Sequence, residues 1–375
     1  MEKIKLDTNV VPPVIEDFNN KLKSSIIGQN QALDKISNSL CKLYSGIRNE
    51  ESPVLSFLFL GSTGVGKTET VKILSDYFFG NRISFTRINC QEYSQDHTVS
   101  RLIGSPPGYI GGEIEPILSQ NNIDKHWKEA KRRRRAVFRN YSHKIHKCFN
   151  ITKGEFLSII LFDEVEKAHP RFWDILLGAL DDGHIIMSNN KEVNLRNSII
   201  VMTSNVGSYE MNKKLSNSGI GFNISDNERQ NEIEELVIES AKNEFPPEFI
   251  NRFDSVIVFN SLKREDVIKM FDKEFSLVKE RIKKKTRATI EVTDSAREYI
   301  IDKGYSRELG ARNMNRYVND LIVSPISKLI VSDEIKRNDI IEIDFVGNEL
   351  AFYKQEKKTT KTKTPKRIKA KAASK

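Results

Sequence analysis

The chain of 375 residues is long enough for two folded domains and some appended segments. Its 38% hydrophobic and 30% charged residues are ordinary for a globular protein, and no apolar run approaches the length of about eighteen residues that a membrane span needs, so we expect no membrane partner. The first residues lack the pattern of a secretion signal, and the three cysteines form no C-x-x-C pair, which favours a reducing compartment without a cysteine–metal site.

The net charge of +9 comes from two short segments rather than from the body of the chain. Residues 125–147 and 351–375 each carry ten Lys or Arg and one Glu, so the remainder sums to −9. Such runs are usually solvated faces or disordered tails. A nucleic-acid-associated protein is the alternative, but only Trp127, Phe138 and Tyr141 are interleaved with the first run as base-stacking aromatics. We therefore expect no nucleic-acid partner.

The elements in chain order predict an α/β fold. Residues 1–17 are expected to be a flexible entry, and apolar residues at helical spacing follow from 18 to 48. Five short apolar runs without strict alternation predict the strands of a parallel sheet flanked by helices on both faces, at residues 57–60, 84–90, 157–162, 197–202 and 255–259. The large domain is expected to cover residues 18–260, with a basic insertion at about 121–155.

After the fifth strand the pattern changes. Helical spacing at residues 267–281, 294–303 and 313–331, with one strand near 340–345, predicts a smaller, mostly helical domain over residues 261–350. Residues 351–375 mix Lys with Thr, Pro and Ala, and we expect a disordered basic tail there.

A glycine-rich loop follows the first predicted strand and leads into a predicted helix. Its pattern, G-x-x-x-x-G-K-T, is typical of a phosphate-binding loop, in which backbone N–H groups and the helix N-terminus face a polyphosphate. Lys67 is expected to reach the β- and γ-phosphates and Thr68 to ligate Mg²⁺. The sequence therefore predicts ATP and Mg²⁺ as cofactors and a nucleotide site made by Gly61, Ser62, Thr63, Gly64, Val65, Gly66, Lys67 and Thr68.

Two adjacent carboxylates end the third predicted strand. Asp163 is expected to hold the Mg²⁺ shell together with Thr68, and Glu164 to polarise a water molecule for attack on the γ-phosphate. Binding alone does not need Glu164, so this pair favours hydrolysis. Asn205 follows the next strand, where its amide is placed to bond that water or the γ-phosphate.

The order of motifs resembles the second ATPase module of the Clp unfoldases, which are hexameric AAA+ machines with a P-loop ATPase domain and a smaller helical C-terminal lid. The motifs are GSTGVGKT, GSPPGYIGG, IILFDEVEKAHP, VMTSNVGS, PPEFINRFD and GAR, and the resemblance covers about residues 26–346. By this resemblance Asn205 is a γ-phosphate sensor, Arg252 an arginine finger for the neighbouring subunit, and Arg312 a second sensor.

The resemblance also assigns two loops. Tyr109, with Ile110, corresponds to the pore loop that grips a threaded polypeptide; a buried loop anchor is the alternative. Ile220, Gly221 and Phe222 resemble the docking loop of the peptidase-partnered Clp type, although such apolar residues also tuck back into the body. Two departures stand out: Ser62 replaces the usual proline, and the region between Tyr109 and Asp163 is longer than in the family.

The resemblance implies an ATP-hydrolysing unfoldase in a homo-hexamer or mixed ring, acting on polypeptides and feeding a ClpP-type serine peptidase. The alternatives are a chaperone or disaggregase without a peptidase, and a subunit that needs a companion ATPase module, because the chain begins where the second module would begin. We expect the cytoplasm or, for an organelle-encoded chain, the plastid stroma.

Overall fold

The computed structural model describes residues 7, 10–45, 47–104, 115–132, 157–217, 226–305 and 313–355. The chain divides into two compact units. The first comprises Met1–Met270 with Gly304–Asn315, and the second comprises Phe271–Lys303 with Arg316–Lys375. Among the described residues, none of the helices combines the length and the apolar character required to cross a bilayer.

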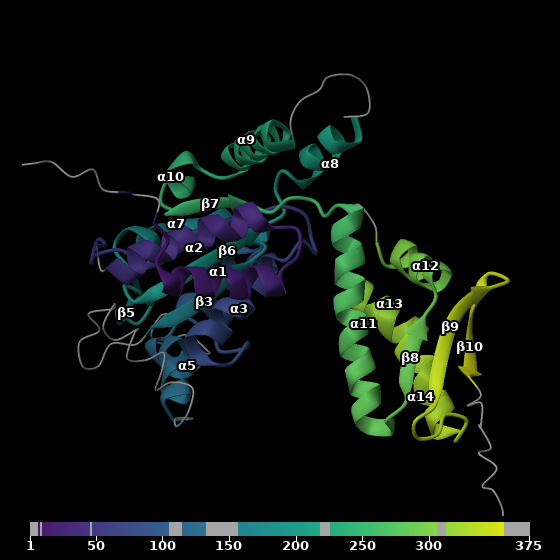
Figure 1. Cartoon of the computed structure of the whole chain (residues 1–375). Helices are drawn as coiled ribbons and strands as arrows, with labels where there is room; N and C mark the ends of the chain where they lie inside the picture. The colour runs from purple at the N-terminus through teal and green to yellow at the C-terminus, as the bar shows by residue number, and fades with distance from the viewer. Residues whose placement is uncertain are drawn as a thin grey trace, which may run out of the picture. The chain divides into compact units, whose positions relative to one another are not determined.

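The first unit is built on a five-stranded sheet in which every neighbouring pair is parallel (Figure 1). This confirms the predicted α/β fold with a parallel five-stranded sheet. The order is β2-β3-β6-β1-β7, so the strand before the glycine loop lies inside the sheet. The strands are β1 (Leu55–Leu60), β2 (Thr86–Asn89), β3 (Ser158–Asp163), β6 (Ser198–Ser204) and β7 (Ser255–Val258).

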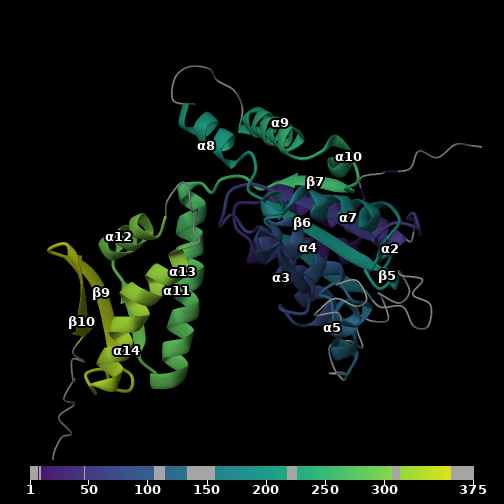
Figure 2. The ribbon, with the colours of Figure 1, turned by 180° about the vertical axis from the view of Figure 1, so that it is seen from behind.

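Helices cover both faces of this sheet, which explains why its central strands are apolar throughout. In β1, Phe57 and Phe59 pack on one face, whereas Leu58 and Leu60 pack on the other. Figure 1 shows α1 and α2 over one face, and the reverse view in Figure 2 shows α4 and α7 over the other. The first face is covered by α1 (Pro13–Ser25), α2 (Asn30–Ser45), α3 (Lys67–Phe79) and α5 (Gln120–Arg132); the second by α4 (Asp96–Ile103), α7 (Pro170–Asp181), α8 (Ser208–Asn217), α9 (Asp226–Glu244) and α10 (Pro247–Ile250).

Two boundaries differ from the predicted ones. Helix α1 begins at Pro13, inside the expected flexible entry, because proline is compatible with a first helical turn and Ile15 is fully buried. Helix α5 occupies the first part of the expected basic insertion. Its apolar residues recur at helical spacing, and Trp127 is buried against the edge of the Phe79 ring at a centroid distance of 6.3 Å. Residues 133–156 lie outside the described structure.

Short elements complete the first unit. A hairpin of β4 (His184–Ile186) and β5 (Glu192–Asn194) was not predicted, because strands of three residues carry too little pattern. Two turns of 3₁₀-helix, η1 (Cys90–Tyr93) and η2 (Val165–Lys167), follow β2 and β3.

The second unit combines helices with a small sheet of order β10-β9-β8. Strand β9 pairs in parallel with β8 and antiparallel with β10. The unit is reached through α11, which begins in the first unit. Its elements are α11 (Arg264–Thr286), β8 (Thr289–Val292), α12 (Asp294–Gly304), α13 (Met314–Val318), the π-helical turn η3 (Asn319–Val323), α14 (Ser324–Val331), β9 (Ile340–Val346) and β10 (Glu349–Gln355).

Strand β10 corrects the predicted start of the disordered tail. Residues 351–355 pair with β9, so that prediction was wrong for this stretch. The cause is a two-residue hairpin at Gly347-Asn348, where both residues have positive φ (59° and 76°), as a turn between right-twisted strands requires. A Gly-Asn pair between apolar runs is a hairpin signal that the sequence contains.

The packing of α5 gives a test of its structural role. Trp127→Ala should lower the free energy of unfolding by about 3–5 kcal/mol, because it leaves a cavity between α5 and α3. Lys125→Ala, on the exposed side of the same helix, is the matched control and should change it by less than about 0.5 kcal/mol. Urea unfolding of the full chain measures both values, and equal losses would contradict a packed α5.

Candidate functional site

The carboxyl ends of three neighbouring strands bring the predicted catalytic residues to one edge of the sheet. The glycine loop follows β1, Asp163 and Glu164 end β3, and Asn205 follows β6, which lies between them. Ligands bind at this edge in open α/β sheets.

The backbone of the loop has the conformation of a phosphate cradle. Gly61, Gly64 and Gly66 have φ values of 137°, 78° and 112°, which other residues rarely adopt. A Cβ on Gly61 would lie 2.3 Å from the carbonyl oxygen of Phe259, so that position accepts glycine alone. Helix α3 begins at Lys67, and its N-terminal N–H groups and dipole therefore meet the loop. The residues present fit a polyphosphate.

Lys67 is buried within this cradle. Its Nζ donates hydrogen bonds to the carbonyl oxygens of Gly61 and Ser62, the latter at 2.9 Å, and to Oδ1 of Asn205 at 2.9 Å. Burial lowers the pKa of Lys67 to about 8, and the carboxylates of Glu166, Asp163 and Glu164 act in the opposite direction. The Lys67 ammonium group therefore lies between the carbonyl oxygens of the loop and a group of nearby carboxylates.

Asp163 and Thr68 provide hard oxygen ligands of the kind that Mg²⁺ prefers. The Asp163 carboxylate accepts a hydrogen bond from Oγ1 of Thr203 at 2.6 Å, and its other oxygen pairs with Arg87 at 2.6 Å. Thr68 is the second residue of α3. Within the described ranges no cluster of three or more His, Cys, Asp or Glu side chains suits a metal. This donor set therefore fits Mg²⁺ held by few protein ligands together with nucleotide phosphates.

Glu164 has a left-handed backbone, with φ 59° and ψ 55°. This conformation is costly for a residue with a Cβ and is found mostly at functional positions. It is held by a hydrogen bond from its backbone N–H to Oγ1 of Thr203 (3.1 Å), and its Oε1 accepts a hydrogen bond from Nδ2 of Asn205 at 3.4 Å. The carboxylate therefore lies beside the Asn205 amide, which the sequence predicts to bond the attacking water or the γ-phosphate.

Sequence reasoning missed three residues of this network. Thr203 bonds both Asp163 and Glu164, and Arg87 pairs with Asp163 from the neighbouring strand β2. Glu166 accepts hydrogen bonds from the backbone N–H and Nδ2 of Asn205, at 3.1 and 3.3 Å. The signal for Thr203 and Glu166 was their position within two residues of a predicted site residue. Arg87 gave no such signal.

Arg252 belongs to the first unit but lies outside the hydrogen-bonded cluster of Lys67, Glu164 and Asn205. Its Nε pairs with Asp181 at 2.8 Å, and about half of its side chain is exposed. Asp254, two residues later, is bonded to the backbone N–H and hydroxyl of Ser56 at 2.9 and 3.0 Å. In the described part of the chain, the Arg252 guanidinium bonds none of the cradle residues.

The remaining predicted site residues lie outside the described residues. They are the pore-loop pair, the docking residues and the second sensor: Tyr109, Ile110, Ile220, Gly221, Phe222 and Arg312.

Two family models match the chain. An AAA domain (Cdc48 subfamily) matches residues 52–128 and 148–256, and the C-terminal, D2-small domain of ClpB protein matches residues 262–343. The gap at 129–147 is shorter than the predicted insertion, because most of α5 belongs to the family's domain.

Curated relatives align with this chain over most of its length. The chaperone protein ClpB of Clostridium perfringens is 35% identical over 88% of the chain, and the chloroplastic chaperone protein ClpC1 of Arabidopsis thaliana is 36% identical over 87%. An ATP-dependent Clp protease ATP-binding subunit ClpC of Staphylococcus aureus is 34% identical over 92%. The chain spans only 34%, 32% and 38% of these proteins, respectively.

A solved structure agrees with these matches. Hsp104 in its closed state, with ATPγS and FITC casein, aligns with a TM-score of 0.70 and 29% identity over 91% of this chain and 51% of that one. The cradle, the strand order and both family models thus lead to one assignment. The chain belongs to the Clp family of AAA+ ATPases, which are nucleotide-binding ATP hydrolases.

Proposed function

We propose that this chain hydrolyses ATP within a hexameric ring and uses the energy to thread polypeptides through a central pore into a ClpP-type serine peptidase. The observation that carries the proposal is the convergence of Lys67, Glu164 and Asn205 on one hydrogen-bonded cluster beside the glycine cradle. A protein that only binds nucleotide needs the cradle but not a carboxylate fixed next to it.

Each residue of the cluster has a separate role in the proposed hydrolysis. Lys67 exchanges its loop carbonyls for phosphate oxygens, which releases one of the bonds that hold Asn205. Glu164 orients a water molecule and takes its proton, while Asn205 keeps the carboxylate in place. Mg²⁺ bound through Thr68 and Asp163 would neutralise the charge that develops on the phosphate oxygens.

The placement of Arg252 supports hydrolysis that depends on ring assembly. Arg252 and Asp254 are tied to Ser56 at the amino end of β1, whereas the cradle begins at Gly61, beyond the carboxyl end of that strand. Five residues of extended chain separate the two ends by about 16 Å. An arginine side chain does not cover this distance, so Arg252 does not reach the cradle of its own chain, which supports the proposal that it serves another subunit's site.

The pore and docking roles rest on the family resemblance of their residues. Tyr109 and Ile110 would grip the polypeptide, and Ile220, Gly221 and Phe222 would contact the peptidase. Arg312 would act as the second sensor. The identity of 35% to ClpB is close to the 34% to ClpC, which favours a chaperone without a peptidase as the second candidate. The relatives include bacterial and chloroplastic proteins, in line with the cytoplasm or plastid stroma.

The mass of the assembled particle tests the proposal. Glu164→Gln keeps the cradle but removes the proton acceptor, so the variant should retain Mg-ATP and hold the ring together. Native mass spectrometry of this variant with the candidate peptidase should give six copies plus the peptidase. Phe222→Ala in the same background should release the peptidase and leave six copies.

The other outcomes discriminate between the candidates. Six copies that never bind the peptidase would favour the chaperone, and monomers alone would refute a self-sufficient ring and require a companion subunit.

A mixing experiment tests whether Arg252 acts in trans. Arg252→Ala should reduce ATP turnover about 10³-fold or more, as expected for an arginine finger. A mixture of Arg252→Ala with Glu164→Gln should regain activity, because one variant supplies Glu164 and its neighbour supplies Arg252. The matched control pairs Arg252→Ala with the double variant Arg252→Ala/Glu164→Gln, which should stay inactive. Failure of the first mixture to regain activity would exclude the trans role.

The lowered pKa of Lys67 predicts a pH dependence of nucleotide binding. Phosphate binding needs the ammonium form, so the affinity for ADP should fall by about tenfold for each pH unit above 8.

The effect of Lys67 on the free energy of unfolding has the opposite sign. Between pH 8 and the ordinary value of 10.5 the unfolded chain binds more protons than the folded one, so Lys67 makes the ligand-free protein more stable as the pH rises. Lys67→Arg stays charged and should abolish both trends. Calorimetric titration and urea unfolding between pH 7 and 10 measure them.

A further inference from the structure

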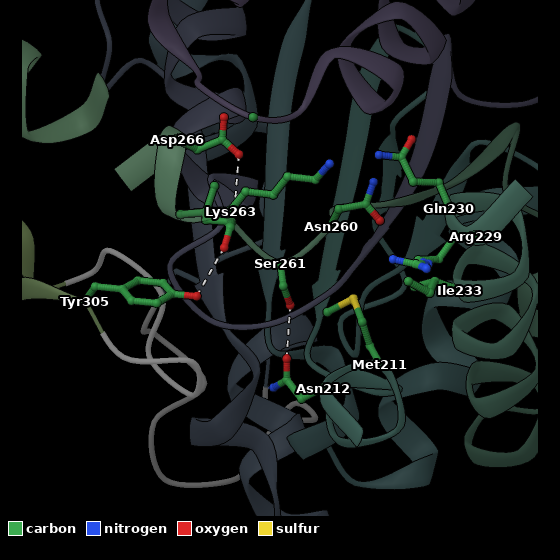
Figure 3. A pocket seen from close by; sticks show the side chains of 12 residues that line it. Met211, Asn212, Arg229, Gln230, Ile233, Asn260, Ser261, Lys263, Asp266 and Tyr305 are labelled. Atoms are coloured by element: carbon green, nitrogen blue, oxygen red, sulfur yellow. Dashed lines mark hydrogen bonds between the residues drawn. The ribbon is translucent and has the colours of Figure 1, made fainter. Parts of the chain in front are cut away.

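A cavity of about 250 Å³ lies within the first unit, between the α8–α9 pair and the segment that follows β7 (Figure 3). Its walls come from Met211 and Asn212 on α8, Arg229, Gln230 and Ile233 on α9, and residues 260–263. The loop from Gly61 to Thr68 does not line it, and neither do Asp163 and Glu164. The cavity is therefore separate from the nucleotide cradle.

Hydrogen bonds fix the segment that forms one wall. Asn260 exchanges two hydrogen bonds with the side chain of Gln29, at 2.8 and 3.0 Å. The hydroxyl of Ser261 bonds Oδ1 of Asn212 at 3.0 Å, and the Tyr305 hydroxyl donates to the carbonyl oxygen of Leu262 at 3.2 Å. A wall held on both sides keeps its shape without a ligand, so the cavity is preformed.

The lining has an apolar part and a cationic part. Met211, Ile233 and Leu262 are buried and supply the apolar surface. Figure 3 shows Arg229 and Gln230 side by side on one wall. Both side chains are partly buried, and among the described residues neither forms a hydrogen bond or ion pair. Neither side chain is among the fully buried groups that lack a partner, so an oxyanion would replace water at these donors and would not have to break a bond within the protein.

The charges around the cavity favour an anion. Arg229 and Lys263 carry positive charge, and among the described residues Asp266 is the one carboxylate in the lining. The Asp266 carboxylate already accepts a hydrogen bond from the backbone N–H of Lys263 at 3.1 Å. A guanidinium with an amide beside it suits the oxygens of a carboxylate, sulfonate or phosphate group.

We propose that this cavity binds a small organic anion, whose apolar body contacts Met211, Ile233 and Leu262 and whose oxyanion is held by Arg229 and Gln230. The volume lies just below the range of about 300–1,000 Å³ for small-molecule sites, which limits the ligand to roughly the size of a two-ring compound. The proposal requires neither ATP hydrolysis nor ring assembly.

Two dyes of nearly equal shape test the charge requirement. The sulfonate dye, 5-(dimethylamino)naphthalene-1-sulfonate, carries an oxyanion, whereas the corresponding sulfonamide has the same two rings and no charge. Fluorescence titration of the full chain should show one saturable sulfonate site. Arg229→Gln should weaken the sulfonate dye about tenfold and the neutral dye less than twofold, since it removes a charge-assisted hydrogen bond and little apolar surface. Lys263→Gln is a second variant, and it should also weaken the binding of the sulfonate dye.

Controls separate this site from the nucleotide site and from general charge effects. Lys242→Gln removes an exposed cation from α9 outside the cavity lining and should leave both affinities unchanged. Saturating Mg-ADP should not displace the sulfonate dye. The proposal is overturned if Mg-ADP displaces it, if Lys242→Gln matches the loss in Arg229→Gln, or if Arg229→Gln affects both dyes equally or neither.

Discussion

The parallel pairing of β3, β6 and β1 is the constraint on which the site depends. Its register joins Leu60 to Ser204 and Phe162 to Met202, so the three strand ends reach the same edge together. Because successive side chains alternate between the two faces, a slip of one residue would exchange the two packed faces along a whole strand. The helices on both faces exclude such a slip, and the same packing that stabilises the fold therefore aligns the cradle with Asp163.

Asn205 connects the parts that this alignment brings together. Its amide oxygen faces Lys67, while its amide nitrogen faces Glu164 and Glu166. A change in the hydrogen bonds of Lys67 can therefore alter those of Glu164 and Glu166 through the side chain of Asn205. Glu166 also has a buried oxygen without a hydrogen-bond partner within the described structure, so this carboxylate can accept one more hydrogen bond.

Features set by local pattern were predictable, and features set by distant partners were not. The apolar runs and the glycine loop identified the sheet and the cradle, because each is encoded in consecutive residues. Arg87 is indistinguishable in sequence from any exposed arginine, and only the pairing of β2 with β3 places it beside Asp163. Strand β8 was missed for a similar reason: only its pairing with β9 identifies the short run Thr289–Val292 as a strand.

The two ends of β1 favour a particular kind of assembly. Gly61 opens the cradle at the carboxyl end, whereas Ser56 anchors the segment of Arg252 at the amino end. If Arg252 of one subunit serves the cradle of the next, the two surfaces in contact are different. Different surfaces make a heterologous contact, which forms a closed ring or an open filament, whereas a two-fold dimer would need both groups within one self-complementary patch. The separation of these groups along one strand is compatible with the heterologous geometry, and the trans role of Arg252 on which that geometry depends is what the family resemblance implies.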